Sequence, residues 1–136
     1  CETEVLYGGA MMVRRDVIEQ VGKMPEVFFL FAEEFDWSYQ ITEAGYKLWY
    51  EAEVVVYHKG GATIGYGSPN RAYYMSRARL LFTRRRSKWA IRLLSCTYLV
   101  CVSMPKNVIV ALRKKNWMVA IALIRGTWHG LIDKKK

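Results

Sequence analysis

The prediction of the fold depends on residues 28–37, which read Phe28-Phe29-Leu30-Phe31-Ala32-Glu33-Glu34-Phe35-Asp36-Trp37. Three carboxylates, Glu33, Glu34 and Asp36, follow bulky apolar residues and open an amphipathic segment that runs to Gly45. We expect a helix over roughly residues 33–44, with Gly45 as its C-terminal cap. Acids in the first turn stabilise the helix dipole, and this alone is one explanation for them. The other is functional, because a carboxylate at the edge of an apolar core can have a pKa suited to proton transfer.

Charge is distributed unevenly along the 136 residues. The first 60 residues carry eleven acidic and five basic side chains, whereas residues 61–136 carry sixteen basic side chains and one acid, Asp133. We therefore expect a globular half that does chemistry and a basic half that meets an anionic partner. With 52% hydrophobic residues the chain can bury a core and is not of the disordered class. Three cysteines without metal-like spacing indicate structural thiols in a reducing compartment, and the missing signal peptide indicates the interior of a longer protein.

Strands are predicted on both sides of the acidic segment. Residues 8–13 read as a buried strand entered through Gly8 and Gly9, a pair that permits close backbone approach, although a simple turn is an equal alternative. A short helix follows over residues 17–21 and stops at Gly22. Residues 46–50 and residues 53–58, which contain Val54, Val55 and Val56, are the next expected strands.

A histidine and a glycine-rich loop follow the last of these strands. His58 stands at the expected strand end, where active sites of α/β sheets gather, although a lone histidine is often structural. Residues 59–68 contain four glycines but no Gly-Lys-Ser/Thr sequence, so they do not form a phosphate-binding P-loop. The loop is either a mobile lid or an ordinary connection.

The basic half is predicted to be helical. A helix capped by Ser68 with Pro69 in its first turn extends to about residue 86 and places Tyr73 and Arg77 on one face. Twice a basic cluster precedes a tryptophan and an apolar run: residues 84–86 before Trp89, and residues 113–115 before Trp117. Because residues 105–107 interrupt the first run, no stretch is expected to span a bilayer. We expect helices that lie on a membrane surface, the alternative being a helical hairpin packed on the globular half.

Six short segments of the chain, taken together in their order and spacing, resemble family 2 glycosyltransferases of the bacterial rhamnosyltransferase-like kind. The pieces are Gly9-Ala10-Met11-Met12-Val13-Arg14-Arg15 with Gly22, then Phe28-Phe29, Glu33-Glu34-Phe35-Asp36-Trp37, Ala44-Gly45-Tyr46, Val54-Val55-Val56-Tyr57-His58 and Tyr73-Tyr74-Met75-Ser76-Arg77. The resemblance covers residues 5–82 and extends to the tail only in character. It implies an α/β fold, namely the C-terminal half of a GT-A fold at residues 1–67, followed by a helical, membrane-associating region at residues 68–136.

The resemblance also implies roles for individual residues. Glu34 would be the general base of an inverting transfer, where the family more commonly has Asp, and Asp36 would orient the acceptor or replace Glu34 as the base. Acceptor or substrate contacts are implied for five residues: Gly8, Gly9, Glu33, Trp37 and Arg77. His58 would help to hold Mg or Mn, but the chain lacks the Asp-x-Asp motif that supplies the family's other metal ligands.

These implications predict the acceptor-side half of a glycosyltransferase in bacterial cell-surface polysaccharide synthesis. Its partners would be a nucleotide sugar donor, a glycan or lipid-linked acceptor and a membrane surface. The expected location is the cytoplasmic face of the inner membrane, peripherally bound, and this half alone is expected to bind donor weakly and not to turn over.

Two readings outside catalysis remain open. One is a membrane-anchoring module whose acids only cap a helix. The other is a nucleic-acid-binding module with a basic, aromatic tail, although the basic residues bracket apolar runs and do not alternate with aromatics, so no nucleic acid is expected as a partner. A glycosidase fits poorly, because its two carboxyls straddle one bond and commonly come from separate elements.

Overall fold

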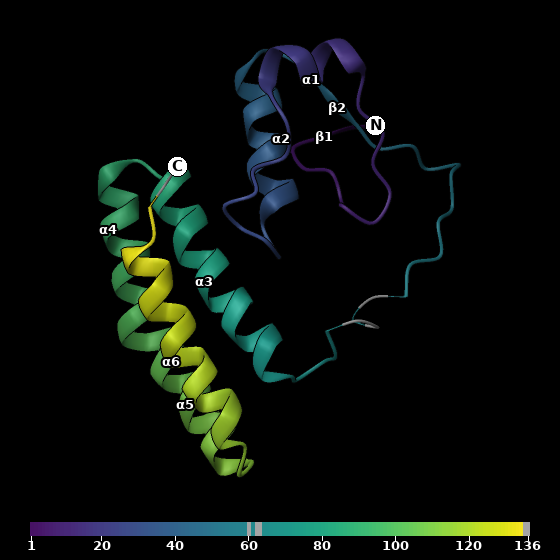
Figure 1. The fold of residues 1–136 in the computed structure, drawn as a ribbon. Helices are drawn as coiled ribbons and strands as arrows, with labels where there is room; N and C mark the ends of the chain where they lie inside the picture. Colours follow the sequence, from purple (N-terminus) through teal and green to yellow (C-terminus); the bar gives the residue numbers. More distant parts are fainter. Residues whose placement is uncertain (60, 62–63, 135–136) are drawn as a thin grey trace. The chain divides into compact units, whose positions relative to one another are not determined.

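A computed structural model describes residues 1–59, 61 and 64–134. Helices account for 59% of the chain and strands for 3% (Figure 1). The elements in order are β1 (Glu2–Thr3), α1 (Arg15–Val21), α2 (Glu33–Glu43), β2 (Leu48–Trp49), α3 (Pro69–Arg86), α4 (Trp89–Tyr98), the π-helical η1 (Leu99–Ser103), α5 (Met104–Arg113) and α6 (Trp117–Ile132). The chain divides into two compact units: Cys1–Glu26 with Ala32–Gly60, and Val27–Phe31 with Gly61–Lys136.

The expected α/β GT-A fold is wrong, because the described chain is mostly helical. Its strands are β1 and β2, which pair antiparallel with Glu2 opposite Trp49 and Thr3 opposite Leu48. The expected strand at residues 8–13 is a turn followed by coil, and residues 53–58 form exposed coil in which Tyr57 is 96% accessible. β-Branched residues favour a strand only where another strand satisfies the backbone, and the described residues place none beside either segment.

The first unit has a small apolar core built on α1 and α2. Val17, Trp37, Ile41 and Leu48 are buried together, and seven partly buried side chains surround them: Leu6, Met11, Val13, Ile18, Val21, Met24 and Tyr46. Gly22 caps α1 as expected, with φ of 96°. The C-cap of α2 is Ala44, and Gly45, which was expected in that position, follows it with φ of 89°. The acidic helix α2 begins at its predicted start, Glu33, ends one residue before its predicted end, and packs Trp37 and Ile41 into this core.

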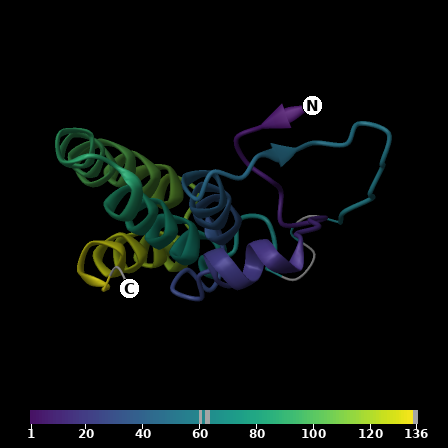
Figure 2. The same cartoon turned by 90° about the horizontal axis from the view of Figure 1, so that it is seen from above.

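The second unit is a bundle of long helices that lie side by side in both views (Figures 1 and 2). The predicted α3 is confirmed: the Ser68 Oγ accepts a hydrogen bond from the Arg71 N–H at 3.1 Å, and Pro69 occupies the first turn. α6 begins in the same way, because the Asn116 side chain accepts from the Val119 N–H at 3.1 Å. Phe28 is fully buried in this unit, and its carbonyl accepts a hydrogen bond from Arg77 at 3.1 Å.

The expected interruption of the apolar run at residues 105–107 is wrong. α4, η1 and α5 form a continuous helix, Trp89–Arg113, of 25 residues, long and apolar enough to cross a membrane by length and composition. Pro105 lacks an N–H and crowds the preceding turn, but it occupies the first turn of α5, directly after the wider π-helical turn. This turn accommodates the proline without a break in the helix.

Two glycines allow α3 and α6 to pack backbone against backbone. A Cβ at Gly126 would lie 2.3 Å from the Tyr73 carbonyl oxygen, and one at Gly130 would lie 2.8 Å from the Arg77 carbonyl oxygen. The same face carries hydrogen bonds between Tyr73 Oη and His129 Nδ1, and from Arg77 to Asp133, each of 2.6 Å. The two helices therefore run in the same direction, with residues 73–77 of α3 beside residues 126–133.

Substituting Gly126 with alanine should destabilise the protein. Alanine in an open helical position gains about 1 kcal/mol over glycine, but here its methyl group would overlap backbone that has no side-chain freedom to give way. Overpacking of this kind costs about 1–3 kcal/mol, so the sign of the propensity effect should reverse. Thermal unfolding in detergent followed by circular dichroism measures the change. Ile124→Ala on the exposed side of α6 serves as the control, and a Gly126→Ala protein as stable as the wild type would contradict this packing.

Candidate functional site

The acidic helix α2 is entered through strained backbone. Phe29, Phe31 and Ala32 have φ values of 63°, 67° and 70°, a left-handed conformation that costs a non-glycine residue about 1–3 kcal/mol. Ala32 is the N-cap of α2 and supplies no side-chain hydrogen bond to the first turn. Strain of this kind gathers at functional sites, and here it directly precedes Glu33 and Glu34.

Glu34 has the electrostatic character expected of a proton acceptor. Its side chain is half-buried, and this burial raises the pKa of the Glu34 carboxyl above its ordinary value. A backbone hydrogen bond opposes the shift, and the neighbouring charge of Glu33 adds to it. A carboxylate with a raised pKa holds a proton more firmly, which makes Glu34 a stronger base than an exposed glutamate.

A turn at residues 7–10 brings the glycine pair to this carboxyl and to His58. A Cβ at Gly8 would lie 3.7 Å from the Glu34 Cβ and 3.8 Å from its Cδ, which is ordinary contact. A Cβ at Gly9 would lie 3.3 Å from Cγ of the exposed His58 ring, tighter than most side chains tolerate. The structure thus brings together four residues that the sequence singled out, from three separate segments, without burying the carboxyl completely.

The two neighbouring acids are in different surroundings. The Glu33 Oε2 atom is buried, and it has no hydrogen-bond partner within the described part of the chain. Asp36 is fully buried and accepts a hydrogen bond from Gln40 Nε2 at 2.9 Å. Its carboxylate is therefore closed to solvent, whereas the Glu34 side chain is only half-buried.

Two of the expected substrate-contacting residues have structural partners. Trp37 is 6% exposed, and its Nε1 donates to the Gly22 carbonyl at 2.9 Å, so its ring packs in the core and presents no free face to a sugar. Arg77 belongs to the helical unit, where its guanidinium contacts Asp133 and the Phe28 carbonyl. Both side chains therefore have packing roles in the fold, and the substrate contacts expected of them stay predictions.

An aromatic pair beside the site was missed in the sequence. The rings of Tyr7 and Phe35 contact each other edge-to-face, with their centroids 6.5 Å apart. In the sequence, Tyr7 directly precedes Gly8 and Phe35 directly follows Glu34. Tyr7 is 79% exposed and Phe35 37% exposed. The sequence could have indicated this pair, because Tyr7 adjoins the glycine pair and Phe35 adjoins the acidic pair. Exposed aromatic faces are suited to stacking on a sugar ring.

The described residues do not form a metal centre on their own. Throughout residues 1–59, 61 and 64–134 no three His, Cys, Asp or Glu side chains are grouped so that they could hold an ion. His58 alone does not satisfy the several oxygen ligands that Mg or Mn requires. The loop prediction for residues 59–68 falls partly outside the described residues, since positions 60, 62 and 63 are not among them.

Comparisons with protein-family models, with curated proteins and with solved structures find no match to this chain.

Proposed function

We propose that this chain acts in glycosyl transfer, with Glu34 as the general base. Glu34 takes the proton from an acceptor hydroxyl while that oxygen bonds to the anomeric carbon of a nucleotide sugar. The bond from this carbon to the diphosphate breaks on the opposite face, so the configuration inverts and the nucleoside diphosphate leaves with the bonding electron pair. No step of this proposal is assigned to a metal ion.

The observation that carries the proposal is the environment of Glu34. Its carboxyl is half-buried, has a raised pKa, and lies beside the glycine turn that also contacts His58. A group that only caps a helix gains nothing from a raised pKa, because the helix dipole favours its ionised form. General bases in contrast work best when their pKa approaches the operating pH. Tyr7 and Phe35 add an exposed aromatic surface for the acceptor sugar.

The second unit supports a membrane-bound acceptor. It contains a helix long and apolar enough to be membrane-associated, with exposed tryptophans at residues 89 and 117. A glycan or lipid-linked acceptor at the cytoplasmic face of a bacterial membrane, in cell-surface polysaccharide synthesis, is the substrate class that we propose. Peripheral binding is the proposed mode.

The experiment that tests this function is transfer by the intact protein from a panel of nucleotide sugars to a lipid-linked acceptor. Transfer by the wild type that Glu34→Gln abolishes supports the proposal. If Glu34→Gln transfers sugar as fast as the wild type, the acids of α2 have only a structural role. The exposed apolar helices favour a second candidate in that case, a non-catalytic membrane-anchoring module.

Removing the charge of Glu33 should shift the pH dependence of transfer. The Glu33 charge raises the pKa of Glu34, so Glu33→Gln lowers it. Because the base works only when deprotonated, the acidic limb of the kcat/KM profile should move to lower pH. Glu43→Gln, further along α2, should leave this limb in place. A limb that Glu33→Gln does not move would contradict the electrostatic coupling of Glu33 to the titrating base.

A further inference from the structure

The helical unit exposes two apolar stripes along neighbouring helices. On α6 five exposed apolar residues recur every three or four positions, at Trp117, Ile121, Ile124, Trp128 and Ile132, and Met118 is exposed beside the first of them. On the helix Trp89–Arg113 the corresponding stripe contains Ile91, Leu94, Tyr98, Val102 and Ile109. The exposed Lys106 lies between the last two, and Leu93 and Val110 are exposed beside the stripe. This spacing keeps each stripe on one side of its helix, which is typical of helices that lie in a membrane interface.

Basic residues flank both ends of the long helix. Four precede it, at residues 84–86 and 88, although Arg84 donates to the Gly130 and Asp133 carbonyls within the unit. Arg113 is its last residue, and Lys114 and Lys115 follow it. A helix that crosses a bacterial membrane is usually basic on its cytoplasmic side only. Basic clusters at both ends, each next to an exposed tryptophan, instead match a helix whose two ends meet the same anionic headgroup layer.

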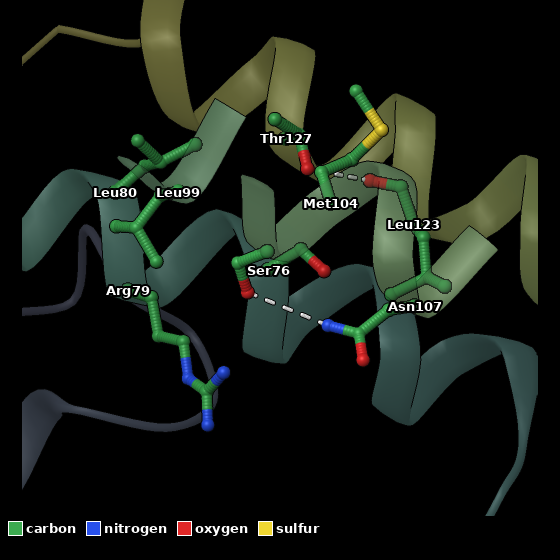
Figure 3. Close-up of a pocket in the computed structure, with 9 residues that line it drawn as sticks. Ser76, Arg79, Leu80, Leu99, Met104, Asn107, Leu123 and Thr127 are labelled. Carbon is green, nitrogen blue, oxygen red and sulfur yellow. Dashed lines mark hydrogen bonds between the residues drawn. The ribbon is translucent and has the colours of Figure 1, made fainter. Parts of the chain in front are cut away.

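Arg79 of the neighbouring helix α3 lies beside the midpoint of the long helix. A cavity of about 30 Å³ lies between the helices. Its lining includes Ser76 and Arg79 of α3, Leu99, Met104 and Asn107 of the long helix, and Leu123 and Thr127 of α6 (Figure 3). Leu99 and Met104 bracket the middle of Trp89–Arg113. Arg79 is exposed, and its guanidinium points away from the other labelled side chains in Figure 3.

This arrangement makes a transmembrane orientation unfavourable. The length of Trp89–Arg113, about 37 Å at 1.5 Å per residue, suffices to cross a bilayer. However, a crossing would carry α3 with it, because Gly126 and Gly130 fix α3 against α6. Arg79 would then lie near the centre of the hydrocarbon, where an arginine is strongly disfavoured.

We propose that the helical unit lies in the plane of one membrane leaflet, with both ends of Trp89–Arg113 on the same side. The apolar stripes of this helix and of α6 enter the acyl region, the flanking lysines and arginines contact anionic headgroups, and α3 stays on the aqueous side. The occupant of the exposed apolar surface is a lipid bilayer that contains anionic lipids. The inference rests on the membrane association proposed above and defines its geometry, but it does not depend on the role of Glu34.

Cysteine labelling distinguishes this geometry from a crossing. Cys1, Cys96 and Cys101 of the intact protein are changed to serine, and a single cysteine is introduced by Lys88→Cys or by Lys114→Cys, both at exposed positions outside the apolar stripes. A membrane-impermeant maleimide is applied to intact spheroplasts and to inverted membrane vesicles, each with and without detergent. Circular dichroism and transfer activity show whether each variant is folded and active.

The proposal expects both sites to be labelled in inverted vesicles as fully as in detergent, and neither to be labelled in intact spheroplasts. Labelling of one site from each side would overturn it and show a crossing, while membrane association would stand. Recovery of the protein in the soluble fraction, without binding to vesicles of phosphatidylethanolamine and phosphatidylglycerol, would overturn both the geometry and the association. The transfer activity of the same variants tests the role of Glu34 independently. A wrong membrane geometry and a wrong assignment of Glu34 can therefore be distinguished.

Discussion

Replacing Glu34 with glutamine should reduce transfer by about 100- to 10,000-fold, the usual contribution of a general base. Glutamine keeps the size and the half-buried position of the side chain but does not accept a proton from the acceptor hydroxyl. Glu34→Asp keeps the carboxylate and withdraws it by one methylene, so it should retain more activity than Glu34→Gln. Initial rates of sugar transfer measure the change, with Glu43→Gln on the same helix as the control that leaves the rate unaltered.

This loss should occur without loss of stability. The folded-state pKa of Glu34 is raised, so its protonated form favours folding; that contribution is complete below the ordinary pKa and disappears as the pH rises through the raised value. At neutral pH the folded protein therefore carries a partly desolvated charge that glutamine removes. The unfolding temperature of Glu34→Gln at pH 7 should be equal to or higher than that of the wild type. A marked drop would mean that Glu34 stabilises the fold and that the activity loss is indirect.

Arg77→Ala should destabilise the helical unit by about 2–3 kcal/mol. The Arg77 side chain is 14% exposed and the Asp133 side chain 31% exposed in a 2.6 Å ion pair, and the same guanidinium donates to the Phe28 carbonyl. Removing one partner of a buried ion pair costs about 3–5 kcal/mol, and the partial exposure of Asp133 reduces this value. Denaturant or thermal unfolding in detergent measures the change.

Arg79→Ala on the same helix is the matched control. Its side chain is exposed, so it should alter stability by no more than about 0.5 kcal/mol. Equal effects of the two substitutions would show that the Arg77 ion pair contributes nothing specific. In that outcome the assignment of Arg77 to packing fails, and a contact with substrate becomes the better account of this residue.

The helices could be predicted from the sequence because their signals are local. Ser68 with Pro69 begins α3, and Gly22 and Gly45 end α1 and α2, through contacts that span a few residues. Among the strands, the expected segment at residues 46–50 contains β2, Leu48–Trp49. Residues 8–13 and 53–58 form no strand, since a strand exists only with its partner and the described residues place none beside them. Pro105 was misleading because its effect depends on the π-helical turn that precedes it.

The candidate site was partly predictable for the same reason. The acids of α2 and the glycine pair are visible as short motifs, and the structure brings Gly8 to Glu34 and Gly9 to His58. The structural roles of Trp37 and Arg77 depend on partners 15 and 56 residues away, which no local pattern reveals. Burial also distinguishes Glu34 from Asp36, which the resemblance implies as the first and second candidates for the base.

The single-turnover rate of transfer at saturating donor, measured for the wild type and for Glu34→Gln, tests the central claim most directly. This rate isolates the chemical step from donor binding and product release. The account predicts a rate at least about 100-fold lower in Glu34→Gln, with donor affinity retained. Equal single-turnover rates in the two proteins would contradict it.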